Sequence, residues 1–183
     1  MCVTYPFAKI GHSTWIHHSC ELSRASASLI SVGSSVLLDR SVSIEILESP
    51  HPSKPSLILE DGVKIQQNTT ISARNHIHIQ SNTICGQSVL IMDHAEELQD
   101  GPCGVNRKTV GGSILVEEGC WIANRAVIVS RDGELVIGRN SVIGANSVVT
   151  RSVPPYSIVL GNPGRVIKQY DPATGKWVLG KRP

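Results

Sequence analysis

The chain has 183 residues, a formal net charge of +2, 17% charged residues and 4% aromatic residues. This length fits a single domain, and so small a net charge argues against nucleic acid or an anionic membrane as the main partner. No apolar run is long enough to span a bilayer, and the N-terminus lacks the basic-then-apolar plan of a signal peptide, so we expect a cytoplasmic protein.

Aliphatic residues, with one cysteine among them, recur at every sixth position in triplets along the chain. The pattern is clearest near the C-terminus, where Ile137, Ile143 and Val149 follow one another at steps of six. The longer steps fall only between triplets. The eighteen positions are Ile10, Ile16, Leu22, Val32, Leu38, Ile44, Leu59, Ile65, Ile71, Ile79, Cys85, Ile91, Val116, Ile122, Ile128, Ile137, Ile143 and Val149.

Each triplet predicts one coil of a three-sided solenoid, in which short strands alternate with turns. A β-sandwich also alternates, but its strands would not keep a step of six across six triplets. We therefore predict an all-β chain of about six three-sided coils over residues 1–153. Every insertion falls after the third strand of a triplet, and the longest is a loop over residues 95–112.

The prolines at 154 and 155 predict the end of the repeat, because proline cannot donate a backbone hydrogen bond to a seventh coil. Residues 154–183 would then form a C-terminal cap and tail, with a turn over 161–164 and a short capping segment over 165–168. The apolar column needs such a lid where it would otherwise end in water.

The five cysteines contain no Cys-x-x-Cys pair, so their spacing does not predict a metal site. Cys20, Cys85 and Cys120 fall at aliphatic or corner positions, where a small apolar side chain is required. Cys103 lies in the long loop and its role is open.

Four segments carry a resemblance to a known family, namely 120–124, 143–150, 153–156 and 161–168. They look like the C-terminal half of the hexapeptide-repeat acyltransferases, with the maltose, galactoside and polysaccharide O-acetyltransferases as the most similar branch. The resemblance covers roughly residues 30–170. It implies a left-handed parallel β-helix, a homotrimer with active sites between subunits, and direct transfer of acetyl from acetyl-CoA to a hydroxyl group, with no metal.

In that family a histidine takes the proton of the acceptor hydroxyl as the hydroxyl attacks the thioester. Many relatives read Asp-His-x-His where this chain has Asp93, His94, Ala95 and Glu96, so Glu96 stands in place of the second histidine. Either His94 or Glu96 would then be the base, or activity is lost. We favour His94, because an imidazole suits proton transfer near neutral pH better than an unshifted carboxylate.

By the same match, the contacts to acetyl-CoA would come from the coils that follow the loop. These residues are Trp121, Ala123, Asn124, Ala145, Thr150, Arg165 and Lys168. Asn124 would polarise the thioester carbonyl or hold the oxyanion, and Arg165 and Lys168 would face the adenosine phosphates. Contacts to the acceptor would come from Gln66, Arg74 and Asp93, and Arg74 replaces a family acidic residue, which suits an anionic sugar.

The sequence thus predicts an acetyl-CoA-dependent O-acetyltransferase for a saccharide hydroxyl. The absence of an N-terminal helical segment favours the polysaccharide branch. Glu96 in place of histidine keeps open a non-catalytic β-helix scaffold. His76 and His78 together with His94 keep open a metal hydratase similar to the γ-carbonic anhydrases, although the His-x4-His pair of those enzymes is absent.

Overall fold

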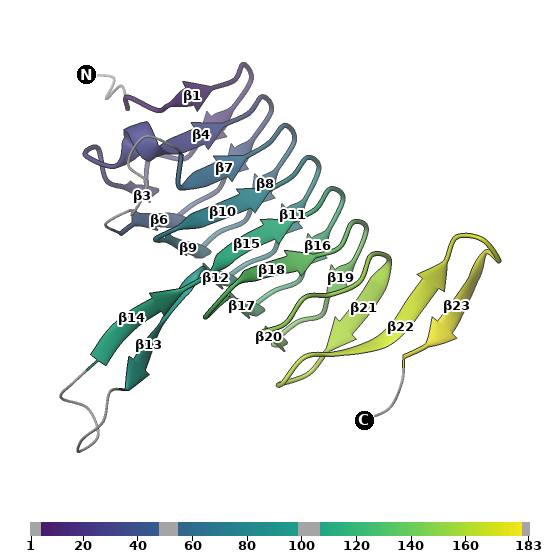
Figure 1. The fold of residues 1–183 in the computed structure, drawn as a ribbon. Coiled ribbons are helices and arrows are strands. Elements are labelled where there is room, and N and C mark those ends of the chain that lie inside the picture. The colour runs from purple at the N-terminus through teal and green to yellow at the C-terminus, as the bar shows by residue number, and fades with distance from the viewer. Residues whose placement is uncertain (1–4, 48–54, 99–106, 181–183) are drawn as a thin grey trace.

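In a computed structural model of the chain, which describes residues 5–47, 55–98 and 107–180, short strands wind into a three-sided prism (Figure 1). The first sheet has the order β1-β4-β7-β10-β15-β18. Its strands are β1 (Lys9–Ile10), β4 (Ile30–Val32), β7 (Leu57–Leu59), β10 (His76–Ile79), β15 (Ser113–Val116) and β18 (Glu134–Ile137).

The second sheet is the longest, because the C-terminal strands extend it. Its strands are β2 (Trp15–Ile16), β5 (Leu37–Leu38), β8 (Lys64–Ile65), β11 (Ile84–Cys85), β16 (Trp121–Ile122), β19 (Val142–Ile143), β21 (Ser157–Leu160), β22 (Arg165–Asp171) and β23 (Lys176–Leu179). The third sheet holds β3 (Glu21–Leu22), β6 (Ser43–Ile46), β9 (Thr70–Ala73), β12 (Leu90–Met92), β17 (Val127–Val129) and β20 (Val148–Val149). A 3-10 turn, η1 (Ala27–Leu29), precedes β4.

The predicted step of six is confirmed by the register of every sheet. Ile79 pairs with Val116 in the first sheet, Cys85 with Ile122 in the second and Ile91 with Ile128 in the third, all in parallel. From the second coil to the sixth, the aliphatic residues of the repeat are at most 3% exposed, so their side chains form one continuous core. The first coil is more open, with Ile10 53% exposed and Phe7 packed against the end of the core.

Three corners join the sheets, and we number them by the sheet that precedes them. The first corner leads from the first sheet to the second, the second corner from the second to the third, and the third corner from the third sheet back to the first. All the insertions lie at the third corner, as the sequence predicts. The longest is not a plain loop: β13 (His94–Leu98) and β14 (Arg107–Gly111) pair as an antiparallel hairpin.

The column continues past the prolines, contrary to the prediction that they end the repeat. Val153 bridges Ile137 in parallel, and Val159 pairs with Ile143. Pro154 and Pro155 are exposed at the first corner, where a missing backbone donor does not interrupt a strand ladder. A partial seventh coil therefore precedes the C-terminal strands.

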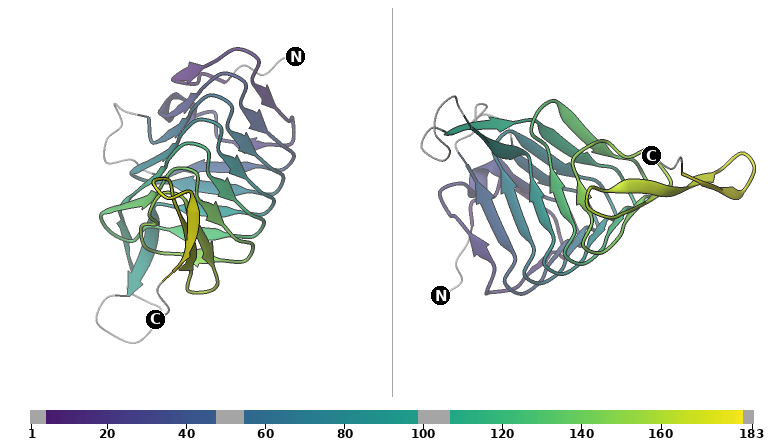
Figure 2. Two further views of the ribbon diagram at one scale, coloured as in Figure 1. Left: turned by 90° about the vertical axis from the view of Figure 1, so that its right-hand side faces the viewer. Right: turned by 90° about the horizontal axis from the view of Figure 1, so that it is seen from below.

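The C-terminal segment is longer than the short cap that the sequence predicts. The turn at 161–164 leads into β22, which pairs antiparallel with β21 and then with β23. Val166 packs against the end of the core, but β22 and β23 then leave the prism. Figures 1 and 2 show this arm and the hairpin β13–β14 projecting in different directions. No helix of the described residues has the length and apolar character needed to cross a membrane.

Candidate active site

Asp93 organises the third corner, at the point where the hairpin leaves the prism. Its carboxylate accepts backbone N–H bonds from Arg74 and Asn75 at 2.8 Å each and from His76 at 2.7 Å. The residue is 0% exposed. The chain reverses between β9 and β10, so these three donors have no strand partner and a carboxylate is a suitable acceptor for them.

His94 follows directly and is held by the same carboxylate. Its Nδ1 lies 3.2 Å from Oδ1 of Asp93, and the residue is 7% exposed. If Nδ1 carries the proton and donates it to Asp93, Nε2 holds the basic lone pair. The pair therefore sets the orientation and the tautomer of the imidazole, as a general base requires.

The return strand of the hairpin closes over this pair. Gly112 donates its N–H to the Asp93 carbonyl at 2.9 Å, and the side-chain amide of Asn75 donates to the Gly112 carbonyl at 2.8 Å. A Cβ on Gly111 would lie 2.6 Å from Nδ2 of Asn75 and 3.3 Å from Cβ of His94. Glycine at this position is therefore what lets β14 pass close to the histidine.

Asp93 is thus placed differently from the sequence expectation, which gave it a contact with the acceptor. The carboxylate faces inward and is occupied by backbone donors, because the turn beside it needs an acceptor more than the surface does. Arg74 is half-buried, and the bond from its backbone N–H to Asp93 places it beside His94. Gln66 follows β8 at the second corner and does not lie with this group.

Glu96 lies two residues after His94 on β13, and alternation along a strand puts the two side chains on the same face of the hairpin. It is exposed, and its Oε1 accepts a hydrogen bond from the Thr109 hydroxyl at 3.0 Å across the strand pair. The third corner therefore holds His94 and the backbone of Arg74 on Asp93, and Glu96 follows on the same strand as His94, held by Thr109.

Two of the residues predicted to contact the cofactor meet at the second corner. Asn124 and Ala145 line a hollow of about 360 Å³ together with Gln87, Ser88, Arg125 and Asn146. Oδ1 of Asn124 accepts the backbone N–H of Gln87 at 3.0 Å, which leaves its amide NH2 available to a ligand.

Two more of these residues stand just before this hollow, on the same coil. Trp121 points outward from β16 and is 55% exposed. Ala123 is half-buried, and its backbone N–H donates to the Ile143 carbonyl.

The remaining predicted cofactor residues lie elsewhere. Thr150 and Arg165 share a hollow of about 230 Å³ that begins at the third corner, beyond the last strand of the third sheet. Lys168 is exposed on β22, in the C-terminal arm. Within one chain the predicted cofactor residues therefore fall into separate groups rather than lining one groove.

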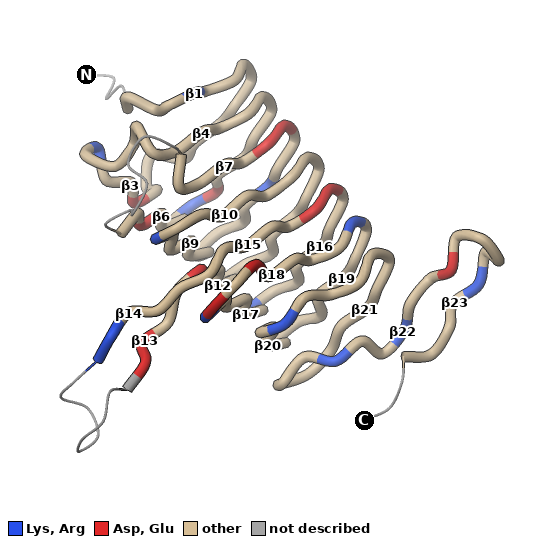
Figure 3. Tube along the Cα trace, viewed as in Figure 1, with Lys and Arg blue, Asp and Glu red and all other residues tan. Residues whose placement is uncertain are grey.

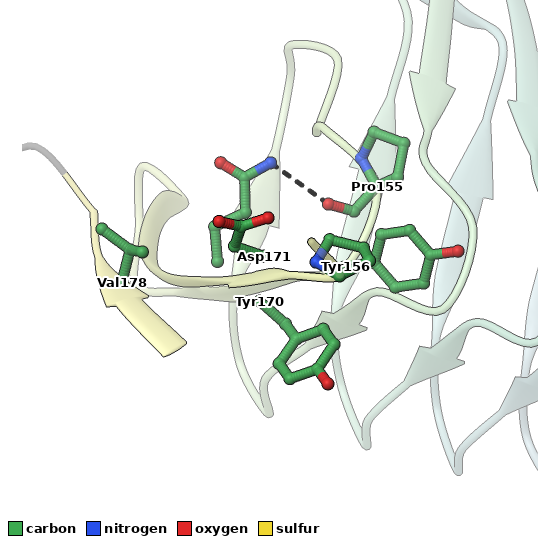
Figure 4. Close-up of a pocket in the computed structure, with 7 residues that line it drawn as sticks. Pro155, Tyr156, Tyr170, Asp171 and Val178 are labelled. Carbon is green, nitrogen blue, oxygen red and sulfur yellow. Dashed lines mark hydrogen bonds between the residues drawn. The ribbon is translucent and has the colours of Figure 1, made fainter. Parts of the chain in front are cut away.

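A further pocket, of about 520 Å³, lies where the arm leaves the prism and is shown in Figure 4. Pro155, Tyr156, Tyr170 and Val178 give it an apolar, aromatic lining, and the two tyrosine rings lie 6.5 Å apart. It is remote in the fold from the hairpin that begins at His94, so we do not assign it to the same site.

The sequence reasoning missed a second histidine–carboxylate pair, on the outer face of the first sheet. Nε2 of His78 lies 2.7 Å from Oε1 of Glu60, and Ser81 donates to Oε2 at 2.8 Å from its hydroxyl. Partial burial alone would raise the pKa of Glu60, but the bonds from Ser81 and His78 outweigh it and hold the pKa below its ordinary value of 4.5. His76 and His78 alternate with buried isoleucines along β10, and this pattern could have predicted that the His78 side chain lies on the outer face of the sheet.

The cysteine prediction is confirmed for the described residues, whereas Cys103 lies outside them. Cys85 and Cys120 are buried, and Cys20 is half-buried at a corner. Burial raises the pKa of Cys85 to about 12 and that of Cys120 to about 11, so both thiols are packing groups. Across residues 5–47, 55–98 and 107–180, no cluster of three or more His, Cys, Asp or Glu side chains is arranged to hold a metal ion.

No family model matches the chain. Among curated proteins it is 27% identical to the bifunctional protein GlmU of Thermotoga maritima, over 98% of this chain and 41% of that protein. It is 33% identical to the serine acetyltransferase of Mycobacterium tuberculosis, over 62% and 49% of the two chains. It is 23% identical to the putative lipopolysaccharide biosynthesis O-acetyl transferase WbbJ of Escherichia coli, over 66% and 64%. The chain thus spans less than two thirds of the length of each of these relatives.

Among solved structures, the fold is similar to that of a mutant of AntD, an N-acyltransferase from Bacillus cereus in complex with dTDP and coenzyme A. The TM-score is 0.76 at 18% identity, over 92% of this chain and 87% of the other. The predicted fold class, a left-handed parallel β-helix, is confirmed. The relatives and structural neighbours are hexapeptide-repeat acyltransferases, as the resemblance in the sequence implied.

Proposed function

We propose that this chain transfers an acetyl group from acetyl-CoA to a hydroxyl group of a saccharide, with His94 as the general base. The observation that carries the proposal is the fixed pair of His94 and Asp93 at the corner where the hairpin begins. The relatives named above, which are acyltransferases, support the reaction class.

In this reaction Nε2 of His94 accepts the proton of the acceptor hydroxyl while the oxygen attacks the thioester carbonyl. The C–S bond then breaks, and the imidazolium returns its proton to the departing thiolate of CoA. Asp93 keeps the ring oriented and stabilises the imidazolium that forms between the two steps. Its three backbone bonds make the carboxylate a fixed support, so little reorganisation is needed during catalysis.

The acceptor is proposed from the chemistry of the third corner and from the neighbours. Another mutant of AntD was solved in complex with dTDP-4-amino-4,6-dideoxyglucose and coenzyme A, and WbbJ is a putative lipopolysaccharide biosynthesis O-acetyl transferase, which favours a sugar acceptor. Arg74 beside His94 would contact an anionic group of that sugar, and Glu96 would accept a bond from one of its hydroxyl groups. Gln66, at another corner, would reach the acceptor only from a different copy of the chain.

We propose further that the working unit is a cytoplasmic homotrimer with the cofactor between copies. The separation of the Asn124 and Ala145 hollow from the Thr150 and Arg165 hollow supports this arrangement. A cofactor that touches both groups, and Lys168 as well, must then be held by two prisms that lie side by side.

The test is release of the CoA thiol from acetyl-CoA with a panel of neutral and anionic sugars, and with L-serine as the alternative acceptor. Wild-type turnover with a sugar is expected, with a loss of about 10²–10⁴-fold in His94→Gln, the range for removal of a general base. Glu96→Gln is the matched variant on the same strand and is expected to keep most of the kcat, while the Michaelis constant of the acceptor rises because a neutral amide oxygen is a weaker acceptor than a carboxylate. If turnover survives in His94→Gln and is lost in Glu96→Gln, the general base is Glu96 and not His94.

Neither alternative releases thiol in this assay. A non-catalytic scaffold releases none with any acceptor, in the wild type as in the variants. A metal hydratase also releases none, and metal analysis of the purified protein together with a carbon dioxide hydration assay, with and without a chelator, separates it from the scaffold. Turnover with L-serine alone would reject the saccharide but keep the reaction class.

A further inference from the structure

The third residue after most aliphatic positions of the first and second sheets has a left-handed backbone conformation, and Ser19, after Ile16, is an exception. Twelve residues of the described chain share this place, with φ between 54° and 72°. At the first corner they are Ser13, Ser35, Gly62, Asn82, Gly119, Asn140 and Tyr156. At the second corner they are Ser41, Asn68, Ser88, Arg125 and Asn146. Every non-glycine residue with positive φ in the described chain belongs to these two series.

Ten of the twelve are serine, asparagine or glycine, the residues expected in this conformation. Glycine has no Cβ to clash, and the short polar chains of serine and asparagine bond locally to the backbone. Arg125, at φ 59°, and Tyr156, also at φ 59°, lack both advantages. A bulky residue held in this region indicates a role for its side chain, because the same corner would be more stable with asparagine.

Tyr156 has a visible reason for its place, since its ring lies 6.5 Å from that of Tyr170 in the pocket of Figure 4. Arg125 has none within the chain. It is exposed, and no salt bridge or side-chain hydrogen bond joins its guanidinium to another group among the described residues.

The surroundings of Arg125 suit an anion. It lines the hollow of about 360 Å³ at the second corner, whose six lining residues are all exposed and include no acidic side chain. The hydroxyl of Ser88 and the free NH2 of Asn124 add two donors beside the guanidinium. Acidic residues gather instead at the first corner, as Figure 3 shows, where Glu60, Asp61, Glu117 and Glu118 follow β7 and β15.

We propose that Arg125 binds a phosphate or carboxylate group of a ligand in the second-corner hollow, with Ser88 and the Asn124 amide as its partners. This gives Asn124 a different role from the thioester contact that the resemblance implied. A guanidinium offers two parallel N–H donors to such a group, which a lysine or a neutral corner residue does not. The inference rests on the proposed function, in which two ligands carry such groups. One is the nucleotide end of acetyl-CoA, and the other is an anionic acceptor sugar.

The test compares Arg125→Asn, which installs the residue found at the same place in the third and sixth coils, at 68 and 146, with the wild type. Arg125→Lys keeps the positive charge but loses the two parallel N–H donors of the guanidinium. Arg40→Asn is the matched control, because it removes one charge at the same corner in the second coil, far from the hollow. Melting is followed with and without inorganic pyrophosphate and CoA. The Michaelis constant is measured for acetyl-CoA, for acetyl-pantetheine, which lacks the nucleotide, and for the acceptor.

Arg125→Asn is expected to raise the Tm of the free protein by roughly 2–4 °C, because the strained corner is relieved. It is expected to weaken binding of the anionic ligand about tenfold or more, the loss of one charge-assisted hydrogen bond. A loss seen with CoA, pyrophosphate and acetyl-CoA but not acetyl-pantetheine assigns the anion to the cofactor. A loss confined to the Michaelis constant of the acceptor assigns it to the sugar. Both support the site.

The inference is overturned if Arg125→Asn binds CoA, pyrophosphate and the acceptor as tightly as the wild type does, whatever happens to the Tm. The same loss in Arg40→Asn also overturns it, since the effect would then be one of net charge. The two proposals can also fail separately. If the wild type shows no turnover with any acceptor but binds pyrophosphate in a way that depends on Arg125, the proposed function is rejected and the anion site is supported.

Discussion

Replacement of Asp93 by asparagine tests whether this buried carboxylate is the support of the candidate active site. Oδ1 accepts the N–H of Arg74 and lies within bonding distance of Nδ1 of His94, and Oδ2 accepts the N–H groups of Asn75 and His76. An amide has one acceptor and one donor group where the carboxylate has two acceptors. Turned one way, the amide leaves the N–H groups of Asn75 and His76 without an acceptor. Turned the other way, it leaves only the N–H of Arg74 without one, because the His94 ring can take the opposite tautomer and accept a hydrogen bond from the NH2.

The magnitude follows from that count. A buried donor without a partner costs about 1–3 kcal/mol, so the loss of one or two acceptors is expected to lower the stability of Asp93→Asn by about 1–6 kcal/mol. For a chain of this length 1 kcal/mol corresponds to about 2–4 °C, which predicts a fall in Tm of at least roughly 2 °C. If the amide places its NH2 toward His94, the ring also takes the opposite tautomer, and acetyl transfer falls in addition.

The assay is urea unfolding followed by tryptophan fluorescence, with circular dichroism as a second probe. Asp132→Asn is the matched control, because Asp132 occupies an exposed place at the same corner in the next coil. It is expected to change stability by no more than about 0.5 kcal/mol, as surface substitutions do. Asp93→Asn with the stability of the control would refute the assignment of Asp93 as the acceptor for this turn.

Three further predictions concern other parts of the prism. Gly138→Ala is expected to lower the Tm by more than Gly133→Ala. A Cβ at 138 would meet the backbone of Pro154 and Pro155, whereas at 133, where φ is +57°, only the left-handed conformation opposes alanine and the space is empty. Equal melting shifts would contradict the packing of the seventh coil. Cys85 and Cys120, with pKa values raised to about 12 and about 11, are expected to resist alkylation at pH 8 until urea unfolds the chain, as peptide mass mapping would show. The lowered pKa of Glu60 predicts a contribution to stability that is present above the pKa of the unfolded chain, near 4.5, and is lost as the pH falls through the pKa of the folded chain. Glu60→Gln should therefore flatten the acid side of a plot of Tm against pH, and an unchanged slope would contradict this contribution.

The register of the prism could be predicted from the sequence because a step of six is a strong geometric constraint. Ile79 and Val116 pair although 37 residues separate them, since both must point into the same column. The insertion between them changes only the corner, and a longer loop adds little to the closure entropy. Aliphatic spacing therefore specifies the core without any knowledge of the loops.

The hairpin and the seventh coil were missed because local sequence does not decide them. Residues 107–111 alternate too briefly to predict a strand, and they become one only because β13 lies beside them. Prolines argue against a strand, but Pro154 and Pro155 stand in the corner, and the apolar spacing resumes at Val159. In both cases tertiary pairing outweighs the local signal.

For the candidate site, the sequence pointed to the corner where the hairpin begins but not to the direction of each side chain. The Asp-His pattern located His94, yet only the fold shows that three backbone donors turn Asp93 inward. Arg125 carried a readable signal, since it interrupts a series of serine and asparagine at one phase of the repeat. The spacing of the buried residues does not show which corner residues have a left-handed backbone, so the buried pattern alone did not single out Arg125.

A coiled column separates the residues that hold the fold from those that contact ligands more completely than most folds do. The buried residue of each strand is set by the neighbouring coils, so it has little freedom to change without loss of packing. The exposed positions of the corners carry no such requirement, provided that the small residue beside them is buried, their few backbone donors are satisfied and their left-handed positions are occupied. His94 and Arg125 depart from the repeat in these two different ways, one through an inserted hairpin anchored on a buried carboxylate, the other through a strained residue in an otherwise regular turn. Ligand sites in this chain should therefore be sought at corners that depart from the repeat. They should not be sought among the outward-facing aliphatic residues of the sheets.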